Sequence, residues 1–222
     1  MILKSQKEQL VNRLAVNLLF CVTLFFALIP QVSADAYQAG VHYEVLSDPV
    51  LTSDPSKIEV VDLFWYGCSH CYTFKTKLES WQKGQLEDVY FIGVPAVWQV
   101  EMRLHAKAYY TAQALKVFDL MHSAIFDAMN LKKEKLKSEA EIAALFVANG
   151  VQQENFSKIF NSGTIAMAAD FAEKKQEKYR LRGTPEIVVN GKYRISGRSA
   201  GSQTEMLQVA SFLIDKERTQ LK

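Results

Sequence analysis

The sequence predicts an α/β fold in which a central mixed sheet is interrupted by an inserted all-helical subdomain. Three observations lead to this prediction. Residues 58–95 have the pattern of a buried strand, a helix and a second strand. From about residue 99 to residue 182 the apolar positions recur with a helical period. A hairpin and a last amphipathic helix follow, and no low-complexity linker or internal repeat divides the chain.

The first 34 residues have the features of a secretory signal peptide. Three basic residues within the first 13 positions precede an almost wholly apolar stretch, residues 14–29, and small residues lead to a cleavage site after Ala34, with Ala36 as a second choice. The alternatives are a retained membrane anchor and a lipoprotein built on Cys21, which the bulky residue before it disfavours. We therefore expect an exported, periplasmic protein whose mature chain spans residues 35–222.

Removal of this segment leaves a mature chain without net charge. The full chain has a formal net charge of +2 and three cysteines, and the segment contains three basic residues, one acidic residue and one cysteine. A neutral chain gives no electrostatic reason to expect binding to nucleic acid or to an anionic membrane. The remaining cysteines, Cys68 and Cys71, would form a disulfide loop too short to remove much chain entropy. Reactivity therefore explains the pair better than stability does.

The first predicted unit consists of a strand, a helix and a strand. Residues 58–65 are rich in β-branched and aromatic side chains, as in a buried strand, and the helix is expected from Ser69 to about Lys83. A second apolar run, residues 89–94, ends at Pro95. Because a helical connection usually joins strands of the same direction, the unit predicts two neighbouring parallel strands.

The predicted helical block has two apolar faces and one clearly delimited helix. Ser138 and Glu141 have the spacing of a capping box, and Asn149-Gly150 has the composition of a helix end. The first face consists of Leu104, Ala108, Leu115, Phe118 and Met121, and the second of Ile165, Ala168, Ala172 and Tyr179.

The hairpin is predicted after this block. Residues 186–189 and 192–195 have the composition of two strands, and Asn190-Gly191 between them favours the positive φ angles of a two-residue turn. The two strands are therefore expected to be antiparallel neighbours.

A last amphipathic helix is predicted after Ser202, whose spacing to Glu205 again fits a capping box. Its apolar face includes Met206, Ala210 and Leu213. Strand, helix, strand, helical block, hairpin and helix in this order describe a thioredoxin fold with a helical insertion at about residues 99–182.

The motif Cys68-Ser69-His70-Cys71 stands at the junction of the first strand and its helix. Two thiols at this spacing can cycle between dithiol and disulfide, and the start of a helix stabilises whichever sulfur becomes a thiolate. The alternatives are an inert structural disulfide and half of a zinc site. The other candidate zinc ligands are scattered without ligand-like spacing: His42, His105 and His122. The motif therefore predicts redox chemistry on protein thiols and no metal.

Three stretches resemble the bacterial DsbA family of periplasmic thiol:disulfide oxidoreductases, which belongs to the thioredoxin superfamily. They are Phe64–Tyr72, Gly183-Thr184-Pro185 and Val188–Arg194, and the resemblance covers essentially the whole mature chain. It implies that Cys68 is the exposed cysteine attacked by a substrate thiolate, and that Cys71 is the inner cysteine that leaves as a buried thiol.

The resemblance also implies roles for residues around the two cysteines. His70 would place a hydrogen bond or a positive charge near the Cys68 sulfur. The peptide bond between Thr184 and Pro185 would be cis, and the Thr184 backbone would pair with an extended substrate, whereas a plain trans turn is the alternative.

Asp62 matches the buried acid that thioredoxin-like enzymes place behind the inner cysteine. It lies six residues before Cys68 on the entering strand and could accept the proton of Cys71, with burial raising its own pKa. The alternative is an ordinary carboxylate at the solvated edge of the sheet.

Two positions depart from the best-known members of the family. Ser69 stands where proline is more usual, which replaces a rigid φ by a freer residue with a hydroxyl near the thiolate. Thr184 stands where strongly oxidising relatives often have valine and isomerase-type relatives often have threonine. A hydroxyl at this position could hydrogen-bond the Cys68 sulfur or the substrate.

By resemblance, the protein donates its disulfide to unfolded exported proteins with free thiols, through a mixed disulfide on Cys68. An uncharged apolar groove lined by Tyr66, Ser69, His70 and residues 183–185 would receive them. A DsbB-type inner-membrane partner would reoxidise the protein, which would need no bound cofactor and would act as a monomer. The rival functions are a disulfide isomerase or reductase, and a periplasmic holdase that keeps the disulfide for structure.

Overall fold

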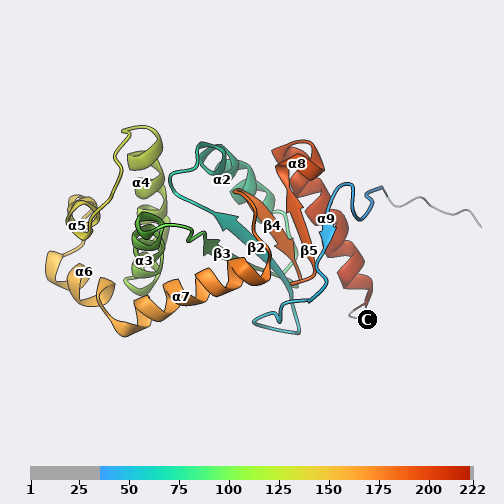
Figure 1. The fold of residues 1–222 in the computed structure, drawn as a ribbon, viewed down its shortest axis with the longest axis horizontal. Coiled ribbons are helices and arrows are strands. Elements are labelled where there is room, and N and C mark those ends of the chain that lie inside the picture. Colours follow the sequence, from blue (N-terminus) through green and yellow to red (C-terminus); the bar gives the residue numbers. More distant parts are fainter. Residues whose placement is uncertain (1–35, 221–222) are drawn as a thin grey trace, which may run out of the picture. The chain divides into compact units, whose positions relative to one another are not determined.

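The computed structural model describes residues 36–220, which contain a five-stranded mixed sheet (Figure 1). The strands lie in the order β1-β5-β4-β2-β3. The predicted signal peptide, residues 1–34, with its cleavage site lies outside the described residues. The strand bounds are β1 Glu44–Val45, β2 Ile58–Phe64, β3 Val89–Pro95, β4 Glu186–Val189 and β5 Tyr193–Ser196.

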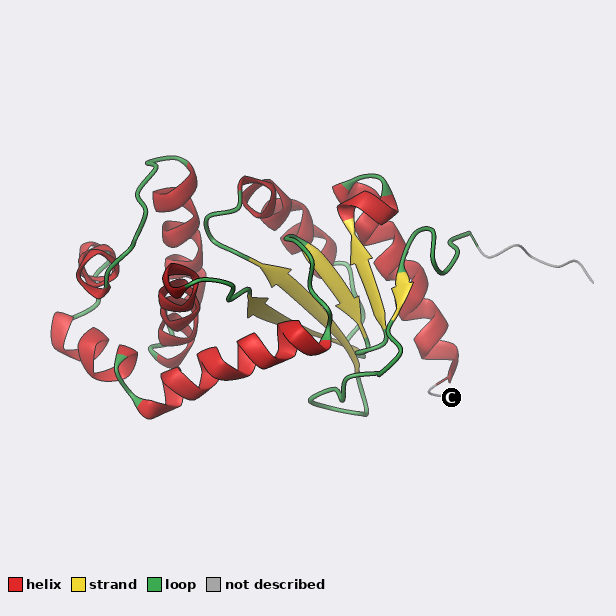
Figure 2. Ribbon diagram, in the orientation of Figure 1, coloured by secondary structure: helices red, strands yellow, loops and turns green. Residues whose placement is uncertain are grey.

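Helices cover both faces of the sheet and form a block between β3 and β4 (Figure 2). Within residues 36–220, no helix has both the length and the apolar character needed to cross a membrane. The element order confirms the predicted thioredoxin fold with inserted helices. The helix bounds are α2 Ser69–Gln82, α3 Val100–Ala114, α4 Phe118–Asn130, α5 Glu139–Ala148, α6 Gln153–Phe160, α7 Gly163–Lys178, α8 Gly197–Ala200 and α9 Gln203–Gln220.

Strand β2 lies inside the sheet between β4 and β3 and is buried on both faces, which explains its nearly continuous apolar sequence. Ile58 and Val60 pack with residues of α2 and α9. Val61 and Leu63 point to the opposite face and pack with residues of α7. Because side chains alternate along a strand, Asp62 shares the face of Val60, which α2 covers. This register places a carboxylate beneath the start of α2.

The strand pairing confirms both predicted supersecondary units. β2 and β3 are parallel, with Asp62 opposite Gly93, and β4 and β5 are antiparallel. At the hairpin turn, Asn190 and Gly191 have φ angles of 51° and 64°. A Cβ at Gly191 would lie 1.9 Å from the carbonyl oxygen of Val50, so only glycine fits there.

The first predicted face of the helical block is divided between two helices. α3 ends at Ala114 and α4 begins at Phe118, and Lys116 between them has a φ of 58°, which a continuing helix does not allow. Ala108 and Met121 nevertheless reach one common core cluster. The five residues therefore share one interior, as predicted, although they come from two helices and the turn between them.

The predicted capping boxes form only in part. The Ser138 hydroxyl accepts the Glu141 N–H (3.2 Å), but the Glu141 carboxylate accepts the N–H of Lys137 and not that of Ser138. Ser202 likewise accepts the N–H of Glu205 (3.1 Å). Both serines thus start their helices as predicted, with one half of the reciprocal pair.

Candidate active site

The redox motif lies at the edge of the sheet where the parallel strands β2 and β3 end. Residues 65–67, called the active-site loop below, connect β2 to Cys68, which caps α2. The Cys71 N–H donates a hydrogen bond to the Cys68 Sγ (3.3 Å). Because the amino end of a helix carries partial positive charge, this position favours a thiolate at Cys68.

A second segment, distant in sequence, contacts the same sulfur. The Cys68 Sγ donates to the carbonyl oxygen of Thr184 at 3.4 Å, across 116 residues of sequence. The peptide bond between Thr184 and Pro185 is cis, as predicted. The fold therefore brings the cysteine motif and the proline segment into direct contact.

The two thiols of the motif, both free, ionise very differently. Hydrogen bonding with Cys71 lowers the pKa of Cys68 to about 5 against the opposing effect of burial, and the Thr184 side chain lowers it further. Burial raises the pKa of Cys71 far above the usual range, and the bond to Cys68 adds to this effect. At neutral pH the reduced pair is therefore a thiolate at Cys68 and a buried thiol at Cys71.

His70 is exposed, and its backbone makes the contacts that the structure shows. Its carbonyl oxygen accepts hydrogen bonds from the Gln203 amide (2.7 Å) and the Thr73 hydroxyl (3.0 Å). Its backbone also contributes to the low pKa of Cys68. A role for the imidazole ring stays a prediction.

Asp62 lies beneath the motif on strand β2. Its Oδ1 atom is buried and has no hydrogen-bond partner among the described residues. Burial raises the pKa of Asp62 to about 7, and the charge on Cys68 adds to the rise. Asp62 and Cys71 line the same cavity, of about 510 Å³. The alternative of a carboxylate at a solvated edge is therefore wrong, and a role of Asp62 as proton acceptor for Cys71 stays a prediction.

Tyr66 does not line a substrate groove, so this part of the predicted site is wrong. Its side chain is fully buried, and its hydroxyl is hydrogen-bonded to the Nδ1 atom of His122 (2.9 Å). The ring lies edge-on to Phe64 and Phe126, with centroids 5.2 and 4.8 Å away. It turns inward because α4 supplies an aromatic cluster and a polar partner for the hydroxyl.

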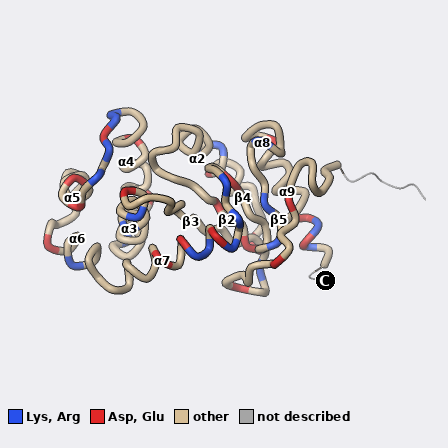
Figure 3. Tube along the Cα trace, viewed as in Figure 1, with Lys and Arg blue, Asp and Glu red and all other residues tan. Residues whose placement is uncertain are grey.

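The other predicted substrate-contacting residues are at the surface. Ser69 is exposed, and Gly183, Thr184 and Pro185 are half-buried. Residues 63–74 and 183–185 contain no lysine, arginine, aspartate or glutamate, as the colouring of the β2–α2 connection shows (Figure 3). The positions that flank Cys68 are therefore uncharged, as predicted.

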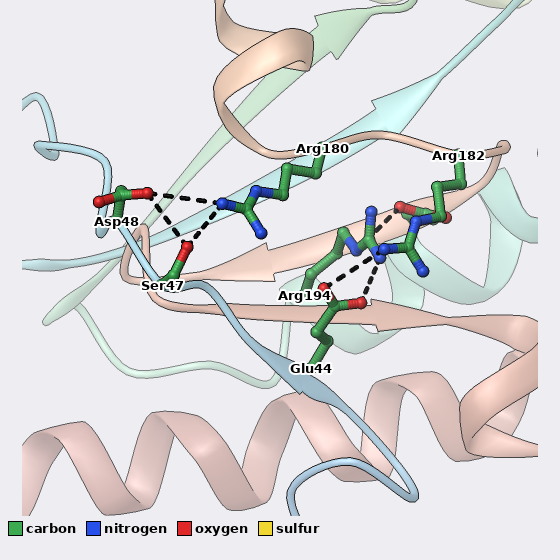
Figure 4. A network of polar contacts seen from close by, with 7 residues as sticks. Glu44, Ser47, Asp48, Arg180, Arg182 and Arg194 are labelled. Atoms are coloured by element: carbon green, nitrogen blue, oxygen red, sulfur yellow. Dashed lines mark hydrogen bonds and ion pairs between the residues drawn. The ribbon is translucent and has the colours of Figure 1, made fainter.

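Ion pairs connect the segment around Pro185 to β1 and β5 (Figure 4). Arg194 pairs with Glu44 (2.5 Å) and its Nε atom lies 3.7 Å from the carboxylate of Glu186, the residue after Pro185. Arg182 also pairs with Glu44 (3.6 Å). Burial raises the pKa of Glu186 to about 7, although the charge of Arg194 opposes this.

Four polar residues beside the motif escaped the sequence analysis. All are in helices far from the motif in sequence. For the three in the helical block the available signal is a polar residue among apolar ones, and for Gln203 there is no such signal. Both histidines stand out in the sequence only as scattered candidates for zinc binding. The four residues are His105, His122, Asn130 and Gln203.

Comparison with known proteins points to one family. The family described as DSBA-like thioredoxin domain matches residues 84–207. The thiol:disulfide interchange protein DsbA of Pseudomonas aeruginosa is 40% identical over 189 residues, which cover 85% of this chain and 90% of that protein. The protein of the same name from Azotobacter vinelandii is 36% identical over 211 residues, covering 94% and 99%.

Solved structures agree with the sequence comparison. The crystal structure of Pseudomonas aeruginosa DsbA has a TM-score of 0.81 at 40% identity and covers 84% of this chain and 97% of that one. The oxidoreductase DsbA from Xylella fastidiosa has a TM-score of 0.76 at 33% identity, covering 82% and 98%. The likeness thus includes nearly the full length of these relatives.

Proposed function

Because the chain belongs to the DsbA family of thiol:disulfide oxidoreductases, we propose that it donates its Cys68–Cys71 disulfide to exported proteins as they fold. The observation that carries this proposal is the asymmetry of the two thiols. Hydrogen bonds lower the pKa of the Cys68 thiol, whereas burial raises that of Cys71.

The transfer begins when a substrate thiolate attacks the Cys68 sulfur. The Cys68–Cys71 bond breaks, a mixed disulfide forms between substrate and Cys68, and the Cys71 sulfur leaves and takes up a proton. Asp62, in the same cavity as Cys71, exchanges that proton. A second substrate thiolate then attacks the substrate sulfur, Cys68 leaves as a thiolate, and two electrons have passed from substrate to enzyme.

The geometry favours oxidation of the substrate. The thiolate exists only in the reduced enzyme, so the hydrogen bonds that stabilise it favour reduction of the enzyme disulfide. A low pKa also makes Cys68 a good leaving group in the second step. Both effects act in the direction of disulfide donation.

Unfolded chains are the substrates that the surface around Cys68 suits best. The flanking positions are uncharged, and an extended segment would pair with the Thr184 backbone beside the sulfur. A surface of this kind selects for apolar, extended chain and not for one sequence. The substrates are therefore exported proteins with free thiols.

Turnover needs a partner that removes electrons from the reduced pair. We propose an inner-membrane protein of the DsbB type, which would reoxidise the Cys68–Cys71 pair in the periplasm. The redox group is the cysteine pair itself, so no bound cofactor is required. The active protein would be a monomer cleaved after Ala34.

The reduction potential of the mature protein tests the proposal. We would equilibrate it in glutathione buffers and follow the cysteine pair by tryptophan fluorescence. A donor should have a potential well above that of thioredoxin, which is about −270 mV. A value at or below that level would contradict disulfide donation.

Two cysteine variants separate the steps. Cys68→Ser should neither transfer a disulfide nor form a mixed disulfide. Cys71→Ser, its matched control, should accumulate the mixed disulfide with a substrate peptide, because the resolving sulfur inside the enzyme is absent. Accumulation on the Cys68→Ser protein would show that the roles are reversed.

A disulfide isomerase is the second candidate, because the Thr184 side chain contributes to the low pKa of Cys68. A threonine hydroxyl beside the sulfur can change how quickly the mixed disulfide is released. Rearrangement of a scrambled substrate by the wild-type protein and by Thr184→Val would test this. An isomerase should lose rearrangement in the variant while oxidation of a dithiol peptide continues.

A further inference from the structure

The active-site loop is held by the helical insertion and not only by the strand that precedes it. Its three residues are Trp65, Tyr66 and Gly67. The side chains of the first two reach two histidines, one on α3 and one on α4. Neither histidine has a part in the disulfide exchange described above.

The first histidine, His105, connects Trp65 to Leu136 through two hydrogen bonds, called the relay below. These bonds define which of its ring nitrogens carries the proton. The indole Nε1 of Trp65 donates to the Nδ1 of His105 (3.0 Å), and the His105 Nε2 lies 3.1 Å from the carbonyl oxygen of Leu136. An indole N–H only donates and a carbonyl only accepts, so His105 must accept at Nδ1 and donate at Nε2. His105 is therefore neutral and in a single tautomer, and burial, which lowers its pKa, keeps it so.

The position of the Trp65 ring decides the position of the rest of the loop. A Cβ at Gly67 would lie 2.3 Å from the Trp65 ring, so the ring lies directly against the Gly67 backbone. The Trp65 carbonyl oxygen accepts the N–H of Cys68 (3.1 Å). Holding Trp65 thus constrains the backbone on both sides of the reactive cysteine.

The second histidine holds the middle of the loop. His122 is bonded to the buried hydroxyl of Tyr66 (2.9 Å), and Asn130 on the same helix donates its amide to the Tyr66 carbonyl oxygen (2.8 Å). Phe118 stacks on the His122 ring at 4.8 Å, and Phe126 meets it edge-on at 5.0 Å. Both the side chain and the backbone of Tyr66 are therefore tied to α4.

We propose that His105 and His122 are positioning residues for the loop that carries the Cys68 sulfur. The proposal rests on the proposed function only in taking Cys68 as the reactive cysteine. The Cys71 N–H that stabilises the Cys68 thiolate lies 3.3 Å from the sulfur, so this stabilisation depends on where the loop places the sulfur. The insertion therefore tunes the reactivity of Cys68 through these two histidines, neither of which is hydrogen-bonded to the sulfur.

The pH dependence of Cys68 alkylation in the reduced full-length mature protein tests the proposal, because it reports the thiolate directly. His105→Phe keeps a buried ring but removes both hydrogen bonds, and we expect its midpoint to rise by about one pH unit. His105→Gln keeps an acceptor and a donor at this position, and its midpoint should stay close to that of the wild type.

A double-mutant cycle identifies the path of the effect. Trp65→Phe removes the indole donor, so adding His105→Phe to it should cause little further shift if the relay carries the effect. Tyr66→Phe and His122→Phe form the second cycle and should behave in the same way. Additive shifts in both cycles would overturn the proposal.

The matched control is Ser211→Ala, which removes the 2.9 Å hydrogen bond from the Trp81 indole at the other end of α2. It should leave the alkylation midpoint unchanged. If His105→Phe and His122→Phe lower the thermal midpoint but do not move the alkylation midpoint, both histidines are merely structural and the proposal is wrong. A low reduction potential of the wild type would refute disulfide donation without affecting this comparison.

Discussion

The two segments that meet at the Cys68 sulfur are supported by different interactions. The active-site loop is held by neutral groups of the helical insertion: imidazole, amide and aromatic rings. The segment around Pro185 is flanked by arginine–carboxylate pairs with β1 and β5 (Figure 4). Salt screens charges and acts weakly on neutral hydrogen bonds. The segment around Pro185 should therefore respond to salt more than the active-site loop does, whereas pH should act on both halves with opposite sign.

Burial and charge pairing together explain which contacts each half uses. Tyr66 is fully buried among aromatic rings, where an unpaired charge would be very unfavourable. In the other half Glu44 and Arg182 lie nearer the solvent, with 37% and 69% of their side chains exposed, and water solvates what their pairing leaves unsatisfied. Arg194 and Glu186 are buried there, and each charge is tolerated because the other lies beside it.

Among single substitutions measured at neutral pH, the loss of the buried arginine should have the largest effect. Arg194→Met should leave Glu186 and Glu44 without their shared partner and lower the free energy of unfolding by about 3 kcal/mol. Urea denaturation would measure it. Arg180→Ala is the matched control, because Arg180 pairs with Asp48 at an exposed site (3.5 Å) and should cost at most about 1 kcal/mol. Equal effects of the two variants would show that burial does not decide the strength of these pairs.

The second prediction uses pH to separate the two halves. Burial raises the pKa of Glu186 from 4.5 to about 7, so the folded protein binds this proton more tightly than the unfolded chain does. Its contribution to stability therefore falls as pH rises from about 4.5 to about 7, by about 1.4 kcal/mol for each pKa unit. Glu186→Gln should flatten the stability profile in this range.

The contribution of His122, which holds the active-site loop, should depend on pH with the opposite sign. Burial lowers the pKa of His122 from 6.5 to about 3, so the unfolded chain binds this proton more tightly. Stability from this group is lost as pH falls from about 6.5 to about 3, and His122→Phe should reduce that loss. The measurement is the free energy of unfolding between pH 3 and pH 8 for the wild type and for both variants. If Glu186 and His122 changed this free energy in the same direction as pH rises, the two halves would not differ as proposed.

The smallest expected effect sharpens the argument for the loop. Gly67→Ala places a Cβ against the Trp65 ring and should destabilise the protein by about 1–3 kcal/mol. It should also raise the pH midpoint of Cys68 alkylation, because the ring must move away from His105. Gly84→Ala is the control, because a Cβ there would lie 3.5 Å from the Trp81 carbonyl oxygen, an ordinary contact. It should change the free energy of unfolding by less than about 0.5 kcal/mol. If Gly67→Ala leaves the alkylation midpoint unchanged, the packing of the loop does not control the reactivity of Cys68.

Local patterns predicted the elements that carry the motifs. The apolar run of β2, the Asn190-Gly191 turn and the Ser138 cap each depend on residues close together in sequence, and each is present. Lys116 shows where such patterns fail. Its positive φ ends a helical face that the apolar period alone would continue, because the turn between α3 and α4 depends on how the two helices pack.

The site divides in the same way. Cys68 and Cys71 were evident from spacing at the start of a helix, and the resemblance of Thr184-Pro185 to a known motif anticipated its contact with the sulfur. The prediction for Tyr66 was wrong, because the side chain of a tyrosine next to an exposed cysteine motif can face either the solvent or the interior. The direction is set by His122, 56 residues later.

The sequence by itself determined the fold class, the reactive pair and the uncharged positions around it, because these follow from periodicity, spacing and composition within short stretches. Only the tertiary structure decided the depth of Asp62, the ion pairs of Glu186 and the histidine contacts of the active-site loop. The physical reason is that burial and hydrogen bonding are properties of pairs of segments. Whether a polar side chain is solvated, paired or left without a partner depends on which distant element packs against it.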